Sequence, residues 1–358
     1  MKVMIAAGGT GGHIYPAVAL AEVLKERNPE TEIIFFGSDN RMESTVVPAL
    51  GYRFCGISMT GMNGGLLAKA ASALSILKAE RFCRKLIKEE KPDIAIGFGN
   101  YISVPLIRAA HRLKVPTLLH EQNSFAGKAN RFLAPVADRI VGCYQSNLEQ
   151  FPADKILLLG NPEASLAART SWDASILKEY DLPENVPFVI CMMGSLGSAS
   201  VSKVIDECLG LLDGDFNVII ATGKENSYEY KHASLENVRV VEYVDGKKML
   251  KGCALAVLRA GATTMAEIGA IGTPSILIPS PYVPNNHQYY NACELSDVDG
   301  AVLIEEKDLN AAVLADAING LMRDPERRER LGRNAYQAGK RDAAEKMVEL
   351  MEVLAANE

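Results

Sequence analysis

Several features of common protein classes are missing from this chain of 358 residues. Basic residues are not in excess, because 38 Lys and Arg stand against 44 Asp and Glu, and the formal net charge of −6 argues against a nucleic-acid-binding protein. No stretch approaches the roughly 18 consecutive apolar residues of a membrane-spanning helix. The apolar run after Lys2 is also short, so we expect neither a membrane span nor a signal peptide.

Cysteine is sparse as well. The seven cysteines are scattered, form no C-x-x-C pair and are odd in number. This usage is typical of reduced core thiols in a cytosolic protein. No His/Cys cluster has zinc spacing, and the chain contains neither a Walker loop nor an intact dinucleotide fingerprint. We therefore expect no metal site and no bound cofactor.

Two acidic pairs need a separate interpretation. Asp213–Asp215 and Asp297–Asp299 have the Asp-x-Asp spacing that a metal-dependent sugar-nucleotide transferase would use. Both lie in glycine-containing stretches that precede apolar runs, which is typical of turns. We favour the turn interpretation for both pairs.

What the chain does contain is a regular alternation of apolar runs and longer helical patterns. With 48% hydrophobic residues, a chain of this length can bury the cores of two domains. The alternation predicts an α/β fold with two doubly wound parallel sheets. The expected strands are 2–7, 32–37, 93–97, 116–120, 139–143 and 156–159, then 188–194, 217–223, 238–244, 254–261, 274–280 and 301–306. The expected helices are 16–27, 41–50, 67–90, 102–113 and 126–134, then one from about 200 and 263–271, 287–295, 309–322 and 326–337.

A polar, proline-containing passage without periodicity separates the two halves near 161–165. We therefore expect an N-terminal domain over 1–162 and a C-terminal domain over 163–340. The last segment, 341–358, has a helical pattern and is expected to pack back on the N-terminal domain. Ligands of doubly wound sheets bind where the strands end, so functional side chains should follow the strands.

The first expected strand runs directly into GGTGGH at 8–13, and Pro16 is expected to open the helix that follows. Glycines let a backbone approach a ligand closely, and a helix N-terminus offers N–H groups and partial positive charge. The pattern G-x-G-x-x-G fails because Ile14 occupies its third glycine position. His13 is a candidate general base, since imidazole, with a reference pKa of about 6.5, can accept a proton at neutral pH. A structural histidine is the alternative.

Other polar motifs also follow expected strands. The first half has GFGNYIS at 97–103 and HEQN at 120–123, whose Glu121 is an alternative base. The second half has MGSLGS at 193–198, which offers N–H and hydroxyl groups to a phosphate, and RAGATTMAE at 259–267. In the last motif Glu267 could accept hydrogen bonds from a ribose diol, or could compensate the helix dipole.

The stretch 61–88 mixes leucines with basic residues behind a glycine-rich segment. Part of the apolar set must pack on the sheet. The mixture of apolar and basic positions in an acidic protein is also typical of a surface that binds anionic lipid. The basic positions are Lys69, Lys78, Arg81, Arg84, Lys85 and Lys88.

Six motifs, taken in order, resemble one known family. They are GGTGGH, GFGxY, HEQN followed by AGxxN, GNP at 160–162, RAGATTMAE at 259–267 and HQxxNA at 287–292. In this order and over nearly the whole chain they resemble the MurG family of bacterial UDP-N-acetylglucosamine:lipid I N-acetylglucosaminyltransferases.

The resemblance implies a GT-B fold, in which two Rossmann-like domains face a cleft. It implies inverting, metal-independent transfer of N-acetylglucosamine (GlcNAc) from UDP-GlcNAc to the C4 hydroxyl of N-acetylmuramic acid (MurNAc) in lipid I. The product, lipid II, serves peptidoglycan synthesis, and the enzyme would be peripheral at the cytoplasmic face of the cell membrane. The partners implied are UDP-GlcNAc, lipid I and, through 61–88, anionic inner-leaflet lipids.

The resemblance also implies site residues. His13 would be the base, with Glu121 as the second catalytic candidate. Glu267 would hold the ribose, and Gln288 with Asn291 would bind the sugar hydroxyls. The substrate-binding set implied is Thr10, Gly11, Gly12, Tyr101, Asn123, Asn130, Ser195, Val244, Arg259, Ala262, Thr263, Thr264, Met265, Ala266, Glu267, Gln288 and Asn291.

The chain departs from the family's pattern at three places. Ala164 stands where the family usually has arginine after GNP, MGSLG replaces GGSQG, and GFGNY replaces GFGGY. These differences leave open a related glycosyltransferase with a different lipid acceptor, or a non-catalytic UDP-sugar-binding scaffold.

Overall fold

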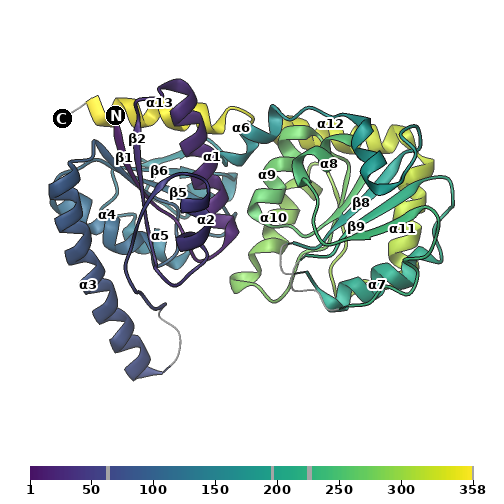
Figure 1. Cartoon of the computed structure of the whole chain (residues 1–358), viewed down its shortest axis with the longest axis horizontal. Coiled ribbons are helices and arrows are strands. Elements are labelled where there is room, and N and C mark those ends of the chain that lie inside the picture. The colour runs from purple at the N-terminus through teal and green to yellow at the C-terminus, as the bar shows by residue number, and fades with distance from the viewer. Residues whose placement is uncertain (62–64, 195–196, 224–227, 357–358) are drawn as a thin grey trace. The chain divides into compact units, whose positions relative to one another are not determined.

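The computed structural model describes residues 1–61, 65–194, 197–223 and 228–356, without the side chains of 66–70 (Figure 1). The chain divides into two compact units. Unit 1 consists of Met1–Ser165 and Asp342–Glu358, and unit 2 consists of Leu166–Arg341. The short helix α6 (Glu163–Ala168) carries the chain from the first unit into the second.

Unit 1 contains a parallel sheet of seven strands in the order β3-β2-β1-β4-β5-β6-β7. All its strand pairs are parallel, so each connection returns over a face of the sheet. The strands are β1 (Lys2–Ala6), β2 (Glu32–Gly37), β3 (Arg53–Gly56), β4 (Ile94–Gly97), β5 (Thr117–Glu121), β6 (Arg139–Gly142) and β7 (Ile156–Leu158). The helices are α1 (Gly11–Arg27), α2 (Glu43–Ala49), α3 (Leu66–Glu90), α4 (Ser103–Arg112), α5 (Lys128–Leu133) and α13 (Ala343–Ala356), with a 3₁₀ turn at Gln145–Glu149.

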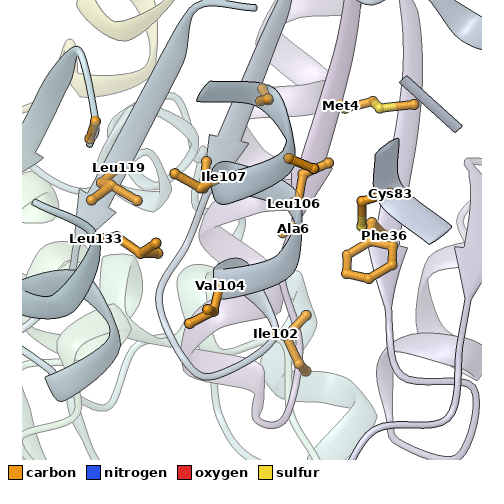
Figure 2. Close-up of a cluster of buried hydrophobic side chains, with 14 of the residues drawn as sticks. Met4, Ala6, Phe36, Cys83, Ile102, Val104, Leu106, Ile107, Leu119 and Leu133 are labelled. Atoms are coloured by element: carbon orange, nitrogen blue, oxygen red, sulfur yellow. The ribbon is translucent and has the colours of Figure 1, made fainter. Parts of the chain in front are cut away.

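Alternate residues of the unit 1 strands point to opposite faces, and both faces are covered. Met4, Ala6 and Phe36 join a core with residues of α3, α4 and α5, including Cys83 and Leu106 (Figure 2). Val3 and Ile5, which alternate with them, are also fully buried. The C-terminal helix α13 packs against α1 (Figure 1), and Arg27 pairs with Glu352 at 2.8 Å.

Unit 2 repeats this plan with a parallel sheet of six strands in the order β10-β9-β8-β11-β12-β13. The strands are β8 (Phe188–Met192), β9 (Asn217–Ala221), β10 (Val238–Val241), β11 (Leu255–Leu258), β12 (Ser275–Leu277) and β13 (Val302–Leu303). The helices are α7 (Ala199–Leu209), α8 (Gly246–Gly252), α9 (Ala262–Ile271), α10 (His287–Ser296), α11 (Ala311–Arg323) and α12 (Pro325–Ala338), with 3₁₀ turns at Ala174–Tyr180 and Pro284–Asn286.

The unit 2 sheet is also covered on both faces. Val189 and Val257 belong to one core, which includes residues of α7 and α11. Ile190 and Leu258 belong to the other core, with residues of α8, α9 and α10. Two doubly wound parallel sheets confirm the predicted fold class.

Four elements differ from the sequence prediction. The edge strand β3 and the short helices α6 and α8 were not predicted, because a strand of four residues and helices of six and seven residues give weak patterns. Helix α1 begins at Gly11 rather than at Pro16. Glycine has low helix propensity and proline lacks an N–H, so the sequence favoured a later start. In the described part of the chain, no helix is long and apolar enough to cross a membrane.

Candidate active site

The strand order places the predicted motifs of unit 1 at one point of its sheet. The order reverses between β1 and β4, which are hydrogen-bonded neighbours. In open α/β sheets this topological switch point, at the carboxyl ends of the strands, is where ligands bind. The loop 7–10 follows β1 and the loop 98–102 follows β4, so GGTGGH and GFGNY meet there.

The fully buried carboxylate of Glu43 packs against the glycine loop 7–10, which follows β1. Glu43 Oε2 accepts a hydrogen bond from the N–H of Gly9 at 2.9 Å, and its Oε1 accepts one from the N–H of Ser38 at 3.0 Å. A Cβ added at Gly8 would lie 2.4 Å from the Glu43 carboxyl carbon. The sequence requires glycine here because the backbone rests directly on this carboxylate.

Asn100 holds the same loop from the β4 side. Its Nδ2 donates to the carbonyl of Gly8 at 3.3 Å, and its Oδ1 accepts from the N–H of Tyr101 at 2.6 Å. The φ of Asn100 is +61°, a left-handed conformation that asparagine tolerates better than most residues. The replacement of GFGGY by GFGNY is therefore compatible with the backbone and adds a side-chain link to the glycine loop. The ring of Tyr101 packs against Gly61, where an added Cβ would lie 3.2 Å from it.

His13 lies in the first turn of α1, half-buried, beside the β4 loop. Its Nδ1 is 2.9 Å from Oγ1 of Thr10. A Cβ added at Gly99 would lie 3.3 Å from Cδ2 and 3.5 Å from Nε2 of His13, and 3.4 Å from Nδ2 of Asn130. The imidazole and the Asn130 amide therefore both approach Gly99, so the switch point brings together two predicted site residues from distant motifs.

Glu121 lies at the end of β5 and is 2% exposed. Its carboxylate accepts hydrogen bonds from the N–H groups of Gly127 and Asn123, at 2.9 and 3.1 Å, and from Nδ2 of Asn130 at 2.9 Å. Burial raises the pKa of Glu121, and these donors act in the opposite direction. The arrangement suits a residue that shapes the 121–130 loop, whereas His13 is the more accessible candidate base.

Asn130 and His120 complete this part of the site. Asn130 is 1% exposed, and its Nδ2 also donates to the carbonyl of His120 at 3.0 Å. Its Oδ1 is buried without a hydrogen-bond partner among the described residues. His120 is fully buried between Gln122 Nε2 at 2.9 Å and the carbonyl of Gly160 at 3.0 Å, and burial lowers its pKa to about 4. His120 is therefore neutral at physiological pH.

Unit 2 has its own switch point between β8 and β11, where Ser198, after β8, meets the start of RAGATT, after β11. Arg259, 8% exposed, bridges the loops there. Its guanidinium donates to Glu306 Oε2 and to Ser198 Oγ, both at 2.8 Å, and to the carbonyl of Ile278 at 3.1 Å. Glu306 also accepts from Ser200 Oγ at 3.0 Å. Arg259 thus fixes the start of α7, and Ser195 in this loop lies outside the described residues.

The remaining predicted residues of unit 2 lie on or beside α9. Ala262, Thr263, Thr264, Met265, Ala266 and Glu267 form its first turns, and Val244 lies buried just before α8. Gln288 accepts a hydrogen bond from the N–H of Ser280 at 2.9 Å. Asn291 is fully buried and donates to the carbonyl of Ala260 at 3.2 Å, so its amide supports the turn before α9.

The two acidic pairs lie elsewhere. Asp213 precedes β9 and pairs with Arg323 at 2.6 Å, and Asp299 precedes β13 and pairs with Arg330 at 2.9 Å. Both are turn residues at the amino ends of strands, away from the switch point. In the described ranges, no group of three or more His, Cys, Asp or Glu side chains could hold a metal ion.

Sequence reasoning missed Glu43 and Glu306, which organise the two switch points. Both lie in polar passages, and no local pattern distinguishes a buried organising carboxylate from a solvated one. It also left Ala164 unexplained. This residue is 2% exposed in α6, so the position where the family usually has arginine is here enclosed by the protein.

Comparison with known proteins agrees with this geometry. Residues 3–141 match the model of the glycosyltransferase family 28 N-terminal domain, and residues 188–347 match that of the family 28 C-terminal domain. The first model spans strands β1 to β6, and the second spans strands β8 to β13. The fold and the matches define a GT-B glycosyltransferase.

Similar proteins with an assigned name identify the family within this class. The UDP-N-acetylglucosamine--N-acetylmuramyl-(pentapeptide) pyrophosphoryl-undecaprenol N-acetylglucosamine transferase of Latilactobacillus sakei is 39% identical, over 98% of this chain and 100% of the relative. The transferase of the same name from Lactiplantibacillus plantarum is 36% identical, over 99% of each chain. The crystal structure of MurG from Acinetobacter baumannii superposes with a TM-score of 0.79 at 25% identity, covering 98% of this chain and 99% of that one. The chain belongs to the MurG family, as its motifs predicted.

Proposed function

We propose that the chain transfers GlcNAc from UDP-GlcNAc to the C4 hydroxyl of MurNAc in lipid I, giving lipid II. The observation that carries this proposal is the position of His13. The imidazole lies at the switch point of unit 1, is half-buried, and is held by Thr10 beside Gly99 within the family's GGTGGH motif. The curated relatives named above carry the name of this transferase.

His13 is the general base of the proposed reaction. It accepts the proton of the C4 hydroxyl while that oxygen attacks the anomeric carbon of GlcNAc. The bond from the anomeric carbon to the phosphate oxygen breaks, and UDP leaves with the electron pair. Because attack and departure occur on opposite faces of the sugar, the configuration at the anomeric carbon is inverted.

Unit 2 supplies most contacts to the donor. Backbone N–H groups at the starts of α7 and α9 stabilise the negative charge of the leaving UDP in place of a divalent ion. Arg259 supports this by fixing Ser198 at the start of α7. Glu267 accepts the ribose hydroxyls, Gln288 contacts the sugar, and Val244 contacts the base. In unit 1 the family pattern adds Thr10, Gly11, Gly12 and Asn123.

Helix α3 supplies reversible association with the cytoplasmic face of the membrane. Leu74 and Leu77 are 61% and 50% exposed on this helix. Lys78, Arg81 and Lys85 are exposed on the same side at helical spacing. The N-terminal end of α3 also projects from its unit (Figure 1). Exposed leucines beside basic residues favour the interface of an anionic bilayer. The side chain of Lys69 lies outside the described residues.

A turnover assay tests this function. The purified chain is given UDP-GlcNAc and a soluble lipid I analogue in the presence of a chelator. We expect UDP and a β-linked disaccharide product in equal amounts. Binding of UDP-GlcNAc without any product would favour the scaffold interpretation. Activity that vanished in chelator and returned with magnesium or manganese would contradict the metal-independent mechanism.

A further inference from the structure

Thr10 is the N-cap residue of α1, yet its hydroxyl makes no capping hydrogen bond to the helix backbone. The N–H groups of His13 and Ile14 both reach the Thr10 carbonyl, at 3.1 and 3.2 Å. Thr10 Oγ1 instead lies 2.9 Å from Nδ1 of His13. The hydroxyl is therefore committed to the imidazole ring, and the helix start does not depend on it.

We infer that Thr10 is a positioning residue that fixes His13 in the tautomer with its proton on Nδ1 and its lone pair on Nε2. A neutral imidazole has one donor and one acceptor nitrogen, and the partner of one nitrogen decides the role of the other. This inference rests on the proposed role of His13 as base, because only a nitrogen with a lone pair can take the proton of the acceptor hydroxyl.

A threonine hydroxyl can donate or accept, and we assign Thr10 Oγ1 the acceptor role toward Nδ1–H of His13. An N-cap side-chain oxygen ordinarily accepts a hydrogen bond from an N–H of the first turn. Here the N–H of His13, the residue three positions on, bonds to the Thr10 carbonyl, and the inferred tautomer puts the ring Nδ1–H in the position of the usual donor. The threonine oxygen then keeps its ordinary role as an acceptor.

The opposite edge of the ring faces Gly99. This glycine has a φ of +84°, and a Cβ there would lie 3.3 Å from Cδ2 and 3.5 Å from Nε2 of His13. A flip of the ring would exchange Nδ1 for Cδ2 at the threonine and would lose the hydrogen bond. The hydrogen bond to Thr10 therefore holds both the orientation and the tautomer of the base in this inference.

This role differs from the one that the family pattern gives Thr10, a contact to the donor. A donor contact predicts that loss of the hydroxyl raises the KM for UDP-GlcNAc. A tautomer role predicts that kcat falls while this KM stays nearly constant, because the ground-state donor complex does not need the base. The two roles can therefore be separated by kinetics.

The test compares Thr10→Val, which keeps the shape and removes the hydroxyl, with Thr10→Ser, which keeps the hydroxyl. The variants are labelled with ¹⁵N-histidine, and NMR at about pH 8, well above the reference imidazole pKa, reports which ring nitrogen of His13 is protonated. The His13 signals are assigned by their loss in His13→Gln. We expect Nδ1–H in the parent and in Thr10→Ser, and a shift toward Nε2–H in Thr10→Val. With a soluble lipid I analogue, kcat of Thr10→Val should fall by about 3- to 10-fold, as loss of one hydrogen bond implies.

An Nε2–H tautomer in the parent, or an unchanged tautomer in Thr10→Val, would overturn the inference. A raised KM of Thr10→Val for UDP-GlcNAc, with parental kcat and an unchanged tautomer, would also overturn it. That result would show that Thr10 contacts the donor instead. A changed tautomer with parental kcat would support the inference and contradict the role of His13 as base. The NMR measurement needs no turnover. Failure of the tautomer inference can therefore be distinguished from failure of the proposed role of His13 as base.

Discussion

The carboxylate of Glu43 accepts a hydrogen bond from the N–H of Gly9 at 2.9 Å, although the two residues lie 34 positions apart. Its other oxygen accepts from Ser38, so one fully buried side chain joins the ends of β1 and β2. Both oxygens act as acceptors, and no neutral side chain of similar size offers two such acceptors. The shape of the loop that leads to His13 therefore depends on this carboxylate.

We predict that Glu43→Gln destabilises the protein and lowers activity. The glutamine amide keeps one acceptor, and its NH₂ group would face a backbone N–H. An unsatisfied buried donor costs roughly 1–3 kcal/mol, so thermal unfolding should occur at a lower temperature and kcat should fall. The control is Glu30→Gln, a fully solvated position, which should change neither. Parental kcat in Glu43→Gln would show that the glycine loop does not need this support.

A second prediction concerns Arg259, which binds Ser198 and Glu306 at once. Lysine carries a point charge and cannot make the same forked contacts. Arg259→Lys should weaken UDP binding by about 10- to 100-fold in calorimetry, because the start of α7 is no longer fixed. The matched control is Arg323→Lys, whose partner Asp213 is a turn residue at the opposite strand ends. An equal loss of UDP affinity in both variants would remove any special role of Arg259.

The membrane surface gives a third prediction. Replacing Leu74, Leu77, Lys78 and Arg81 by serine should reduce sedimentation with vesicles that contain anionic lipid, and added salt should reduce binding of the parent. Activity on a soluble acceptor analogue should remain, since these side chains are exposed on α3. Serine at Lys178 and Lys203, exposed basic residues of unit 2, provides the control. Equal vesicle binding by the α3 variant and the parent would contradict the proposed surface.

His120 gives a prediction about pH. Burial lowers its pKa from 6.5 to about 4, so between these values the unfolded chain binds a proton that the folded chain does not. Stability must therefore fall as the pH drops through this window, by up to about 3 kcal/mol from this residue. In NMR, the His120 ring signals, assigned by their loss in His120→Gln, should stay constant from pH 8 to about 5. A titration midpoint near the reference value of about 6.5 would contradict the buried, neutral state.

Much of the architecture could be predicted from the sequence because local patterns determine it. Buried parallel strands such as Val3–Ala6 are apolar on both faces, and several run into a glycine or serine turn before a helix. The resemblance also located His13 and Asn130. Their approach to a common point at Gly99 depends on the pairing of β1 with β4, which no local pattern contains.

The roles of some site residues required the three-dimensional contacts. The sequence shows that Asn291 and Glu121 are polar residues within motifs. It does not show which groups their side chains contact. The structure buries both and satisfies them with the protein's own backbone, so each supports a loop. Glu43 and Glu306 are organising carboxylates without a sequence pattern, because their partners lie on other strands.

The most direct test of the account is kcat of His13→Ala with UDP-GlcNAc and a soluble lipid I analogue, measured beside Glu121→Gln. General-base catalysis is typically worth 10²–10⁴-fold, so we expect kcat of His13→Ala to fall by roughly that factor while UDP affinity stays nearly unchanged. Glu121→Gln should lose stability and retain more activity than His13→Ala, because Glu121 is a buried acceptor for the 121–130 loop. Near-parental kcat in folded His13→Ala, with a large loss in folded Glu121→Gln, would contradict the account and assign the base to Glu121.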